Sequence, residues 1–326
     1  MTTEQIFDSF NKLNVLVIGD VMLDSYIWGA VERISPEAPV PIVHVKKRDF
    51  RLGGAANVAL NLQALGATPI LCALIGNDDA GKKLQDCLDA QGITKEGLVI
   101  SAQRPTTIKT RVIASHQHVV RIDEESDAVS NTEEESQLFS KIEKLLSQCQ
   151  VIVFEDYDKG VLSASLIEKV VQAAARLKIP TVVDPKKRNF LAYKNVTLFK
   201  PNLKELREGL KIDVEGSNQS QVSKAVEQLK KTLNASGVMI TLSEFGVYMD
   251  YSGEKVKLPA HAREIADVSG AGDTVVSIAA LCVALDLSPK IIATLSNLGG
   301  GLVCQHVGVV PINKDELLAE ALKIKS

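Results

Sequence analysis

The stretch from Asp267 to Thr274 combines residues that bind an anion with an acid that can accept a proton. Residues 275–285, which follow it, are almost wholly apolar, as expected for a helix buried on most sides. Gly270 and Gly272 let the backbone approach a ligand closely, and the unpaired N–H groups of a first helical turn attract negative charge. Asp273 would repel a bound phosphate, but beside a transferring phosphoryl group its carboxylate can accept the proton of an attacking hydroxyl. The stretch alone leaves a simpler alternative open, in which Asp273 caps the helix and the glycines only turn the chain.

Two further stretches place polar groups where a parallel sheet binds its ligands. Residues 14–18 are an apolar, β-branched run typical of a buried strand, and Asp20 and Asp24 follow its carboxyl end. Their carboxylates suit hydrogen bonds from sugar hydroxyls, although either one could instead cap a turn. The range Gly53 to Asn57 places two glycines before a predicted buried helix and an amide in its first turn, which suits hydroxyl recognition.

Segments 25–51 and 106–123 predict a small β layer outside the main sheet, because their apolar residues alternate and show no helical period. We expect this layer to cover a site as a lid. Arg33, Lys109 and Arg111 are its conspicuous cations. A solvated face would also carry cations, but cations on a lid beside a sugar-sized site suit an anionic substrate.

The rest of the chain alternates predicted strands and helices, which is typical of an α/β fold. From Asp267 to Leu322 we expect helix, interrupted near Pro289 and at residues 299–301. The sequence therefore predicts one domain over residues 1–326, with a central, mostly parallel sheet, helices on both faces and a small β lid. Further strands are expected at 70–75, 151–154, 180–183, 197–199, 238–242 and 247–251, and helices at 58–65, 80–91 and 163–177.

Charge balance and cysteine content exclude several classes of protein. The 37 Lys and Arg residues oppose 40 Asp and Glu residues without a long run of one sign, so neither nucleic acid nor a membrane surface is an expected partner. Five scattered cysteines without a C-x-x-C pair favour the reduced thiols of a cytoplasmic protein. No signal peptide or membrane-spanning run is visible. A small-molecule substrate is the expectation that remains.

Three motifs, in this order, resemble the ribokinase-like (PfkB) family of sugar kinases. They are Gly53 to Asn57, Asn202 to Glu205, and Asp267 to Thr274, and they span most of the chain. The resemblance implies a ribokinase-like fold, ATP as the phosphoryl donor, and Mg²⁺. It also implies that Asp273 is the catalytic base and that Gly270, Ala271 and Gly272 form its anion hole.

Further site residues follow from the same resemblance. Glu205 is implied to organise Mg²⁺ through water, and Asp267 and Ser269 correspond to positions that bind a monovalent cation, such as K⁺, in some relatives. The positions implied to bind the nucleotide are Asn202, Glu205, Ser243, Glu244, Gly246 and Asn297. The candidates for binding the sugar or its phosphate, with the cations among them chosen by elimination, are Asp20, Asp24, Arg33, Gly53, Gly54, Asn57, Lys109, Arg111, Asp156 and Lys186.

Within the family, residues 19–24, 33–41, 109–112 and 241–246 are similar to the kinases that phosphorylate D-glycero-D-manno-heptose 7-phosphate at its anomeric hydroxyl. That reaction gives the 1,7-bisphosphate, a precursor of ADP-heptose and lipopolysaccharide. Many such kinases carry a nucleotidyltransferase domain with an H-x-G-H element. These 326 residues contain none, so we expect the monofunctional form or a separate kinase domain. Glu155 departs from the commonest form of the family.

Alternative functions stay open at this point. The chain could phosphorylate another sugar, sugar phosphate or nucleoside, or act as a non-catalytic sugar or nucleotide sensor, although the retained Asp273 argues against a sensor. A dinucleotide-dependent oxidoreductase is disfavoured, because no G-x-G-x-x-G follows the first strand. We also expect a homodimer that forms through the lid, with Trp28, Ile42 and Val43 exposed; packing within the lid is the alternative.

Overall fold

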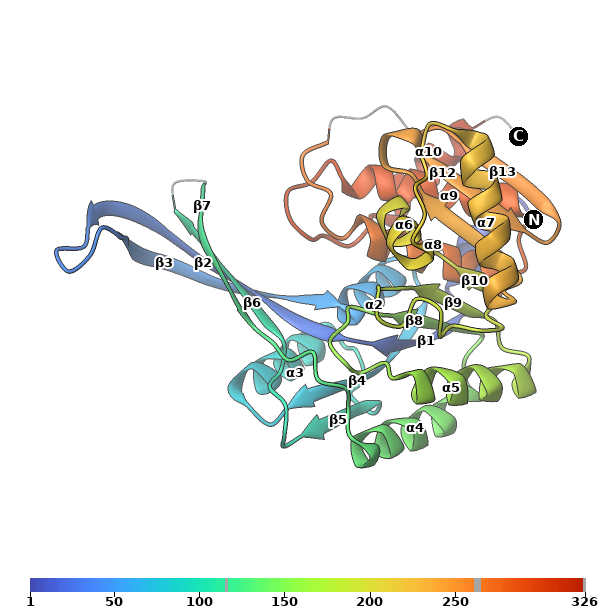
Figure 1. Cartoon of the computed structure of the whole chain (residues 1–326). Helices are drawn as coiled ribbons and strands as arrows, with labels where there is room; N and C mark the ends of the chain where they lie inside the picture. The colour runs from blue at the N-terminus through green and yellow to red at the C-terminus, as the bar shows by residue number, and fades with distance from the viewer. Residues whose placement is uncertain (115–116, 261–264, 325–326) are drawn as a thin grey trace.

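The structure is a computed structural model, and it describes residues 1–114, 117–260 and 265–324. Within these residues, nine strands form one sheet in the order β13-β12-β11-β10-β9-β8-β1-β4-β5 (Figure 1). The pairs from β5 to β11 are parallel, while β12 and β13 pair antiparallel at one edge. The strands are β1 (Asn14–Gly19), β4 (Thr68–Gly76), β5 (Leu98–Ser101), β8 (Val151–Glu155), β9 (Thr181–Asp184), β10 (Leu198–Phe199), β11 (Gly237–Thr241), β12 (Val247–Tyr251) and β13 (Glu254–Leu258).

Helices cover both faces of this sheet (Figure 1), and the central strand β1 shows why. Its side chains alternate between two hydrophobic cores: Val15 and Val17 lie in one, and Leu16 and Ile18 in the other. The expected α/β fold is therefore confirmed. The helices are α1 (Thr3–Phe10), α2 (Ala55–Ala64), α3 (Asp79–Ala90), α4 (Thr132–Leu146), α5 (Ala164–Leu177), α6 (Leu203–Leu210), α7 (Gln219–Leu233), α8 (Ala271–Ala284), α9 (Pro289–Val303) and α10 (Lys314–Lys323).

A second sheet projects from the body as an arm (Figure 1). Its strands are β2 (Val21–Ile34), β3 (Pro41–Gly54), β6 (Ile108–Ala114) and β7 (Gln117–Glu124), in the order β3-β2-β6-β7. The predicted β segments 25–51 and 106–123 fall largely within these strands, and residues 115–116 lie outside the described part of the chain. The role of the arm as a lid stays a prediction. We call this four-stranded sheet the arm below.

The expected exposure of three arm residues is wrong. Trp28, Ile42 and Val43 are half-buried, and the Trp28 ring stacks on Tyr26 with 6.0 Å between the ring centroids. Packing within the arm, the alternative for these residues, accounts for Trp28.

Residues 299–301 do not interrupt the C-terminal helices, so the break expected there is wrong, whereas the break at Pro289, the first residue of α9, is confirmed. Gly299 and Gly300 lie inside α9 against α8. A Cβ on Gly299 would lie 2.1 Å from Ile278 Cδ1, and one on Gly300 would lie 2.8 Å from a Val275 methyl. The glycines thus allow two helices to pack closely, and this need outweighs their low helix propensity.

Candidate active site

The carboxyl ends of four adjacent strands bring the predicted site residues to one edge of the main sheet. Glu155 ends β8 and is paired in register with Asp184, which ends β9. Lys200 follows β10, and Asn202 forms an isolated bridge with Thr241 at the end of β11. This edge is where open parallel sheets bind their ligands.

Asp273 lies over this edge, in the first turn of α8. The helix begins after Gly270, whose φ of 80° a residue with a Cβ rarely adopts, and no side chain caps it. Asp273 is buried and its two oxygens have different partners: Asn57 Nδ2 donates to Oδ2 at 2.6 Å, and the Tyr157 hydroxyl donates to Oδ1 at 2.9 Å. An uncapped helix N-terminus and a fixed carboxylate therefore lie side by side, as phosphoryl transfer to a hydroxyl needs.

Burial raises the pKa of Asp273 to about 6, because a carboxylate loses its hydration inside the protein. The hydrogen bonds from Asn57 and Tyr157 act in the opposite direction, while the charge of Asp184 adds to the rise. A carboxyl group with a pKa near neutrality is well matched to a general base.

Two lysines cross the same edge. Lys200, which is 2% exposed, forms an ion pair of 2.9 Å with Asp184. Lys186 contacts Glu205 at 2.7 Å, and its amine lies 5.2 Å from the centre of the Tyr157 ring. Burial opposes the charge of both lysines, but the neighbouring carboxylates outweigh it, so the pKa of each is raised and both stay protonated.

Glu155 contributes a further carboxyl group that is 1% exposed. Its Oε2 has no hydrogen-bond partner among the described residues. Burial, followed by the charges of Asp184 and Asp273, raises the pKa of Glu155 well above its usual value. A buried carboxyl oxygen without a hydrogen-bond partner is uncommon in folded proteins, so Glu155 is a candidate site residue.

Asp20 and Asp156, both proposed to bind the sugar, have other partners in the structure. Asp20 accepts hydrogen bonds from the backbone N–H groups of Tyr157, Lys159 and Val161 at 2.8 to 3.1 Å. The Asp20 carboxylate thus holds the loop after β8 in place. This contact corresponds to the alternative in which Asp20 caps a turn instead of binding sugar hydroxyls. Asp156 accepts from Asn189, Tyr193 and the backbone of Asp158. Their roles in sugar binding have no support in these contacts.

The arm cations are each paired or distant from Asp273. Arg111 pairs with Asp24, and Lys109 contacts Asp123 of β7 and Glu125 just after that strand. Arg33 is the last residue but one of β2 and pairs with Ile42 at the hairpin end of β2 and β3. Gly53 packs against Asp24, since a Cβ there would lie 2.6 Å from Asp24 Oδ2, while Gly54 has a φ of 60°. The base of the arm therefore places Asp24 and Arg111 together.

The Asn202 to Glu205 motif forms a capping box at the start of α6. Asn202 Oδ1 accepts from the Glu205 N–H at 2.9 Å, and Glu205 Oε2 accepts from the Asn202 N–H at 2.8 Å. Glu205 Oε1 is the atom that faces Lys186. Contact with magnesium through water stays a prediction for Glu205.

Three of the residues predicted to bind the nucleotide belong to one turn. Ser243 and Glu244 line a cavity of about 390 Å³ with Arg207, while Gly246 closes their turn with a φ of 86°. Asn297 does not line this cavity, and its side-chain amide donates to the Pro259 carbonyl at 2.8 Å.

The Asp267 carboxylate accepts from the backbone and hydroxyl of Ser269 at 3.0 and 2.8 Å, and from the Gly308 N–H at 2.9 Å. It therefore ties the loop before α8 to the segment after α9. Binding of a monovalent cation by Asp267 and Ser269 stays a prediction.

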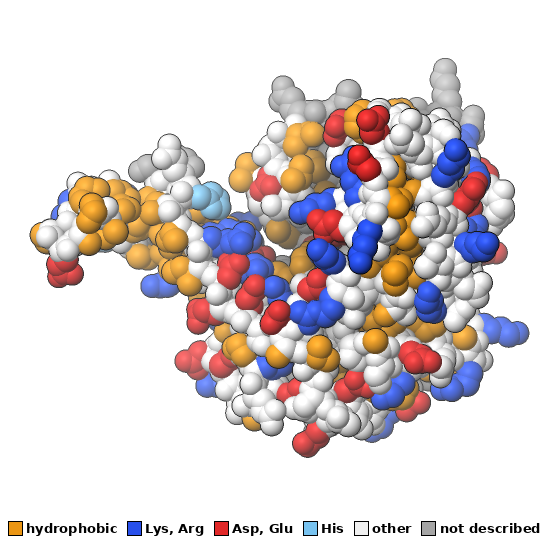
Figure 2. Space-filling view, viewed as in Figure 1, with side chains coloured by type: hydrophobic (Ala, Val, Ile, Leu, Met, Phe, Trp, Pro, Cys, Tyr) orange, Lys and Arg blue, Asp and Glu red, His pale blue; other side chains and the backbone are white. Residues whose placement is uncertain are grey.

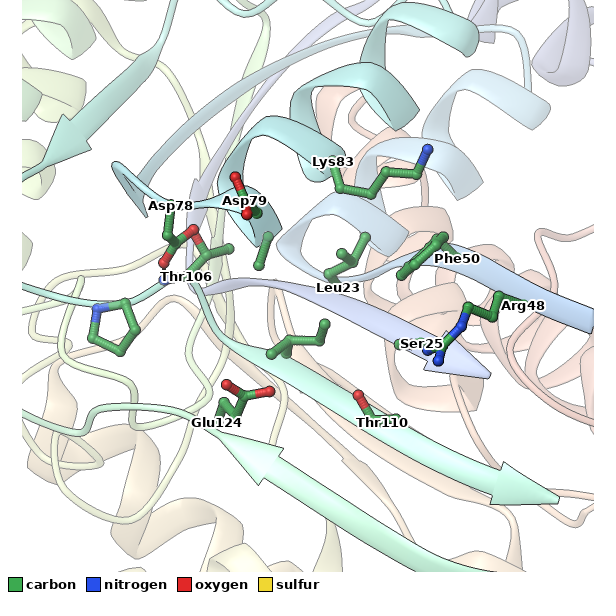
Figure 3. A pocket seen from close by; sticks show the side chains of 13 residues that line it. Leu23, Ser25, Arg48, Phe50, Asp78, Asp79, Lys83, Thr106, Thr110 and Glu124 are labelled. Carbon is green, nitrogen blue, oxygen red and sulfur yellow. Dashed lines mark hydrogen bonds between the residues drawn. The ribbon is translucent and has the colours of Figure 1, made fainter. Parts of the chain in front are cut away.

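A cavity of about 570 Å³ lies between the arm and α3, on the other side of β2 from the predicted site (Figure 3). Leu23 and Ser25 line it, whereas Asp24 between them pairs with Arg111 on the opposite face. Lys83 extends beside Phe50 on this side, 5.3 Å from the ring centre. The cavity thus does not coincide with the carboxylates around Asp273.

Sequence reasoning missed four residues of this edge: Tyr157, Asp184, Lys200 and Glu155 as a site residue. Each follows a predicted strand by one to three residues, which is the signal that could have found them. Choosing among neighbours requires the direction of each side chain, because successive residues at a strand end point to opposite faces.

Comparisons with known proteins point to one family. Residues 12–315 match the model of the pfkB family carbohydrate kinases. The chain is 39% identical over 325 residues to the bifunctional protein HldE of Desulfatibacillum aliphaticivorans, covering 98% of this chain and 66% of the relative. It is 40% identical over 307 residues to the bifunctional protein HldE of Campylobacter curvus, covering 94% and 64%. The chain thus spans somewhat less than two thirds of the length of these relatives.

Among solved structures, the fold is similar to that of phosphofructokinase-2 from Escherichia coli in complex with potassium, with a TM-score of 0.76, 20% identity, and coverage of 95% of this chain and 100% of that chain. No helix of the described residues is both long and apolar enough to cross a membrane. The ribokinase-like fold and the class of enzyme expected from the sequence, an ATP-dependent sugar kinase, are confirmed. This chain belongs to the pfkB family of carbohydrate kinases.

Proposed function

We propose that the chain transfers the γ-phosphoryl group of ATP to the anomeric hydroxyl of D-glycero-D-manno-heptose 7-phosphate. The observation that carries the chemistry is the buried Asp273 beside the uncapped N-terminus of α8. Support for the sugar comes from the four sequence segments that resemble heptose kinases and from the similarity to relatives named bifunctional protein HldE.

In this proposal, Asp273 accepts the proton of the anomeric hydroxyl as that oxygen attacks phosphorus. The N–H groups at the start of α8, after Gly270, stabilise the charge on the phosphoryl oxygens. Lys186 and Lys200 add two positive charges along the same edge. The chain thus supplies positioning and electrostatic stabilisation, which is most of what phosphoryl transfer requires.

The proposal includes a divalent cation at this edge. Four carboxyl groups lie near two lysines there: those of Glu155, Asp184, Glu205 and Asp273, beside Lys186 and Lys200. Within the described residues, no three His, Cys, Asp or Glu side chains form a group that could hold a metal ion by themselves. Magnesium commonly keeps several waters and binds one or two carboxylates plus substrate phosphates. Glu205 would hold it through water. Bound magnesium would neutralise charge on the ATP phosphates.

Binding of a substrate phosphate is supported by two arginines at the base of the arm. The guanidinium carbons of Arg51 and Arg111 lie 4.9 and 5.4 Å from the centre of the Tyr26 ring. Arg51 was not among the candidates from the sequence. Arg51 and Arg111 also pair with the carboxylates of Asp49 and Asp24, and we assign the 7-phosphate to these two guanidinium groups because a sugar phosphate needs cationic donors.

A monovalent cation is a further part of the proposal. The similar Escherichia coli phosphofructokinase-2 was solved in complex with potassium, and Asp267 and Ser269 lie in the loop that leads into α8. Turnover in KCl compared with choline chloride at equal ionic strength tests this part: equal rates contradict it.

The deciding experiment measures ADP release with MgATP and five acceptors: D-glycero-D-manno-heptose 7-phosphate, sedoheptulose 7-phosphate, fructose 6-phosphate, ribose and adenosine. Selective turnover of the heptose 7-phosphate is the expected result. Preference for ribose or adenosine would exclude the heptose assignment, while the assignment of Asp273 as the base would be unaffected.

A further inference from the structure

The hydroxyl of Tyr157 joins the predicted base to the scaffold of the sheet. The phenol donates to Asp273 Oδ1 at 2.9 Å, and the backbone N–H of the same residue donates to Asp20 Oδ2 at 2.8 Å. Asp20 also accepts from Lys159 and Val161 and is 1% exposed. The loop that carries Tyr157 is therefore fixed by a buried carboxylate at the end of β1.

The two donors leave room for a substrate on Asp273. A carboxylate oxygen has two lone-pair sites, so Oδ1 can accept from Tyr157 and from an attacking hydroxyl at the same time. Asn57 Nδ2 meanwhile occupies Oδ2, and Asn57 Oδ1 is buried without a partner in the described structure. The site thus orients the carboxylate before any sugar enters.

Asp273 also faces unfavourable charges. Asp184 from β9 is a negative neighbour and Lys200 after β10 a positive one. Glu155 from β8 is a further carboxyl group nearby, and Lys186 after β9 faces it and Asp184. Helix α2, which packs against α8, has no charged residue and contributes the amide of Asn57. A donor on Oδ1 is therefore one of few groups that favour the ionised base.

We propose that Tyr157 is a positioning residue whose hydroxyl orients Asp273 and stabilises its carboxylate form for proton abstraction. Tyr157 itself exchanges no proton with the substrate. The inference rests on the proposed role of Asp273 as the base.

Carboxyl ¹³C NMR on protein labelled at the aspartate side-chain carboxyl tests the inference without a substrate. The Asp273 signal is assigned by its loss in Asp273→Asn. In Tyr157→Phe, we expect the titration midpoint of Asp273 to rise by about one pH unit, since the phenol hydrogen bond favours the charged form.

Tyr193→Phe is the matched control. Tyr193 is buried and donates to Asp156 Oδ2 at 2.7 Å, and the pKa of Asp156 is also raised to about 6 by burial. This variant should move the midpoint of Asp156 and leave that of Asp273 unchanged. An unchanged Asp273 midpoint in Tyr157→Phe, or an equal shift of the Asp273 midpoint in both variants, overturns the inference.

If Tyr157→Phe does not fold, 3-fluorotyrosine at position 157 replaces it as the test. Its hydroxyl is a stronger donor and should lower the Asp273 midpoint, and an unchanged midpoint overturns the inference.

Kinetics separate this inference from the proposed function. In Tyr157→Phe, the acidic limb of kcat/KM for the best acceptor should move upward with the NMR midpoint, while the KM for ATP stays within about twofold. An Asp273→Asn variant with near-normal turnover overturns the proposed function itself. Loss of turnover in Asp273→Asn, together with an unmoved pH limb in Tyr157→Phe, overturns only the role of Tyr157.

Discussion

Asn57 Nδ2 donates a hydrogen bond of 2.6 Å to Asp273 Oδ2, and this bond joins the first turns of α2 and α8. One turn further along α2, Asn61 Oδ1 accepts a hydrogen bond of 2.9 Å from the hydroxyl of Thr274, the residue after Asp273. Two glycine-containing motifs that are far apart in the sequence thus meet through paired polar contacts. The amide of Asn57 acts on the predicted base directly, in addition to any contact with a sugar hydroxyl.

Replacing Asp273 with Asn should reduce kcat by about 10² to 10⁴, the usual range for loss of a general base. Binding of ATP should change little, because the uncapped helix N-terminus is retained. Isothermal titration with ATP and a turnover assay on the same preparation measure the two effects. A variant that loses ATP affinity in proportion to kcat would show that Asp273 acts in binding instead.

The pH dependence of kcat/KM should show an acidic limb near pH 6, where burial places the pKa of Asp273. The base is ionised above this pH and protonated below it, so activity falls as the pH decreases. Stability has the opposite dependence: the folded state binds this proton more tightly than the unfolded chain, whose pKa is 3.8. The contribution of Asp273 to stability is therefore lost as the pH rises from about 4 to about 6.

Asp273→Asn tests that linkage. Relative to the unchanged protein, the variant should gain up to about 3 kcal/mol in the free energy of unfolding between pH 4 and pH 7. Asn can keep both contacts, since its oxygen accepts from Asn57 and its amide can donate to the Tyr157 oxygen. Urea unfolding at both pH values measures the difference, and a stability difference that does not vary with pH contradicts the assigned pKa.

The sequence predicts the layers of this fold better than the details of its site. Alternating apolar residues such as those of β1 already require two cores, and the glycines before Asp273 require a close backbone approach. By contrast, the predictions selected Asp156 where the structure brings Glu155 and Tyr157 to the site. That choice depends on the direction in which β8 presents its last residues, and hydrophobic pattern does not contain this information.

Lys200 shows a second limit of the sequence. Its partner Asp184 lies on the adjacent strand, so the ion pair exists only once the strand order is known. A lysine at the end of a short apolar run is usually read as solvent-exposed, since lysines are rarely buried unless paired. Here it is fully buried, and the carboxylate explains why this is tolerated.

Replacing Lys200 with Met should reduce the free energy of unfolding by about 3 kcal/mol, because Asp184 is left as a buried charge without its partner. The double variant Lys200→Met, Asp184→Asn should recover most of this loss. Lys82→Met is the control, since Lys82 pairs with Asp79 on the surface and should cost less than about 0.5 kcal/mol. Equal effects of the two single variants would contradict the buried pair.

Gly299→Ala should destabilise the protein by about 1 to 3 kcal/mol, although alanine is normally the better helix former. The added methyl would lie 2.1 Å from Ile278 Cδ1, in a fully buried contact between α9 and α8. Ile278→Val removes that methyl, so the double variant should be more stable than the sum of the single effects predicts. Thermal unfolding of all four proteins measures this coupling, and additive effects would mean that the two side chains do not conflict.

The arm should mediate dimer formation, which is our expectation for the oligomeric state. Apolar side chains cover much of its visible surface (Figure 2), and those of Val120 and Ile122, both on β7, are 48% and 49% exposed. Because these residues are two apart on one strand, they point to the same face and form one apolar surface. Val120→Asp with Ile122→Asp should therefore shift the protein from dimer to monomer. Sedimentation velocity over a range of concentrations measures the change.

Ile100→Asp is the control, because Ile100 is 55% exposed on β5, away from the arm. A monomeric unchanged protein, or equal dissociation by both variants, would contradict a dimer formed through the arm.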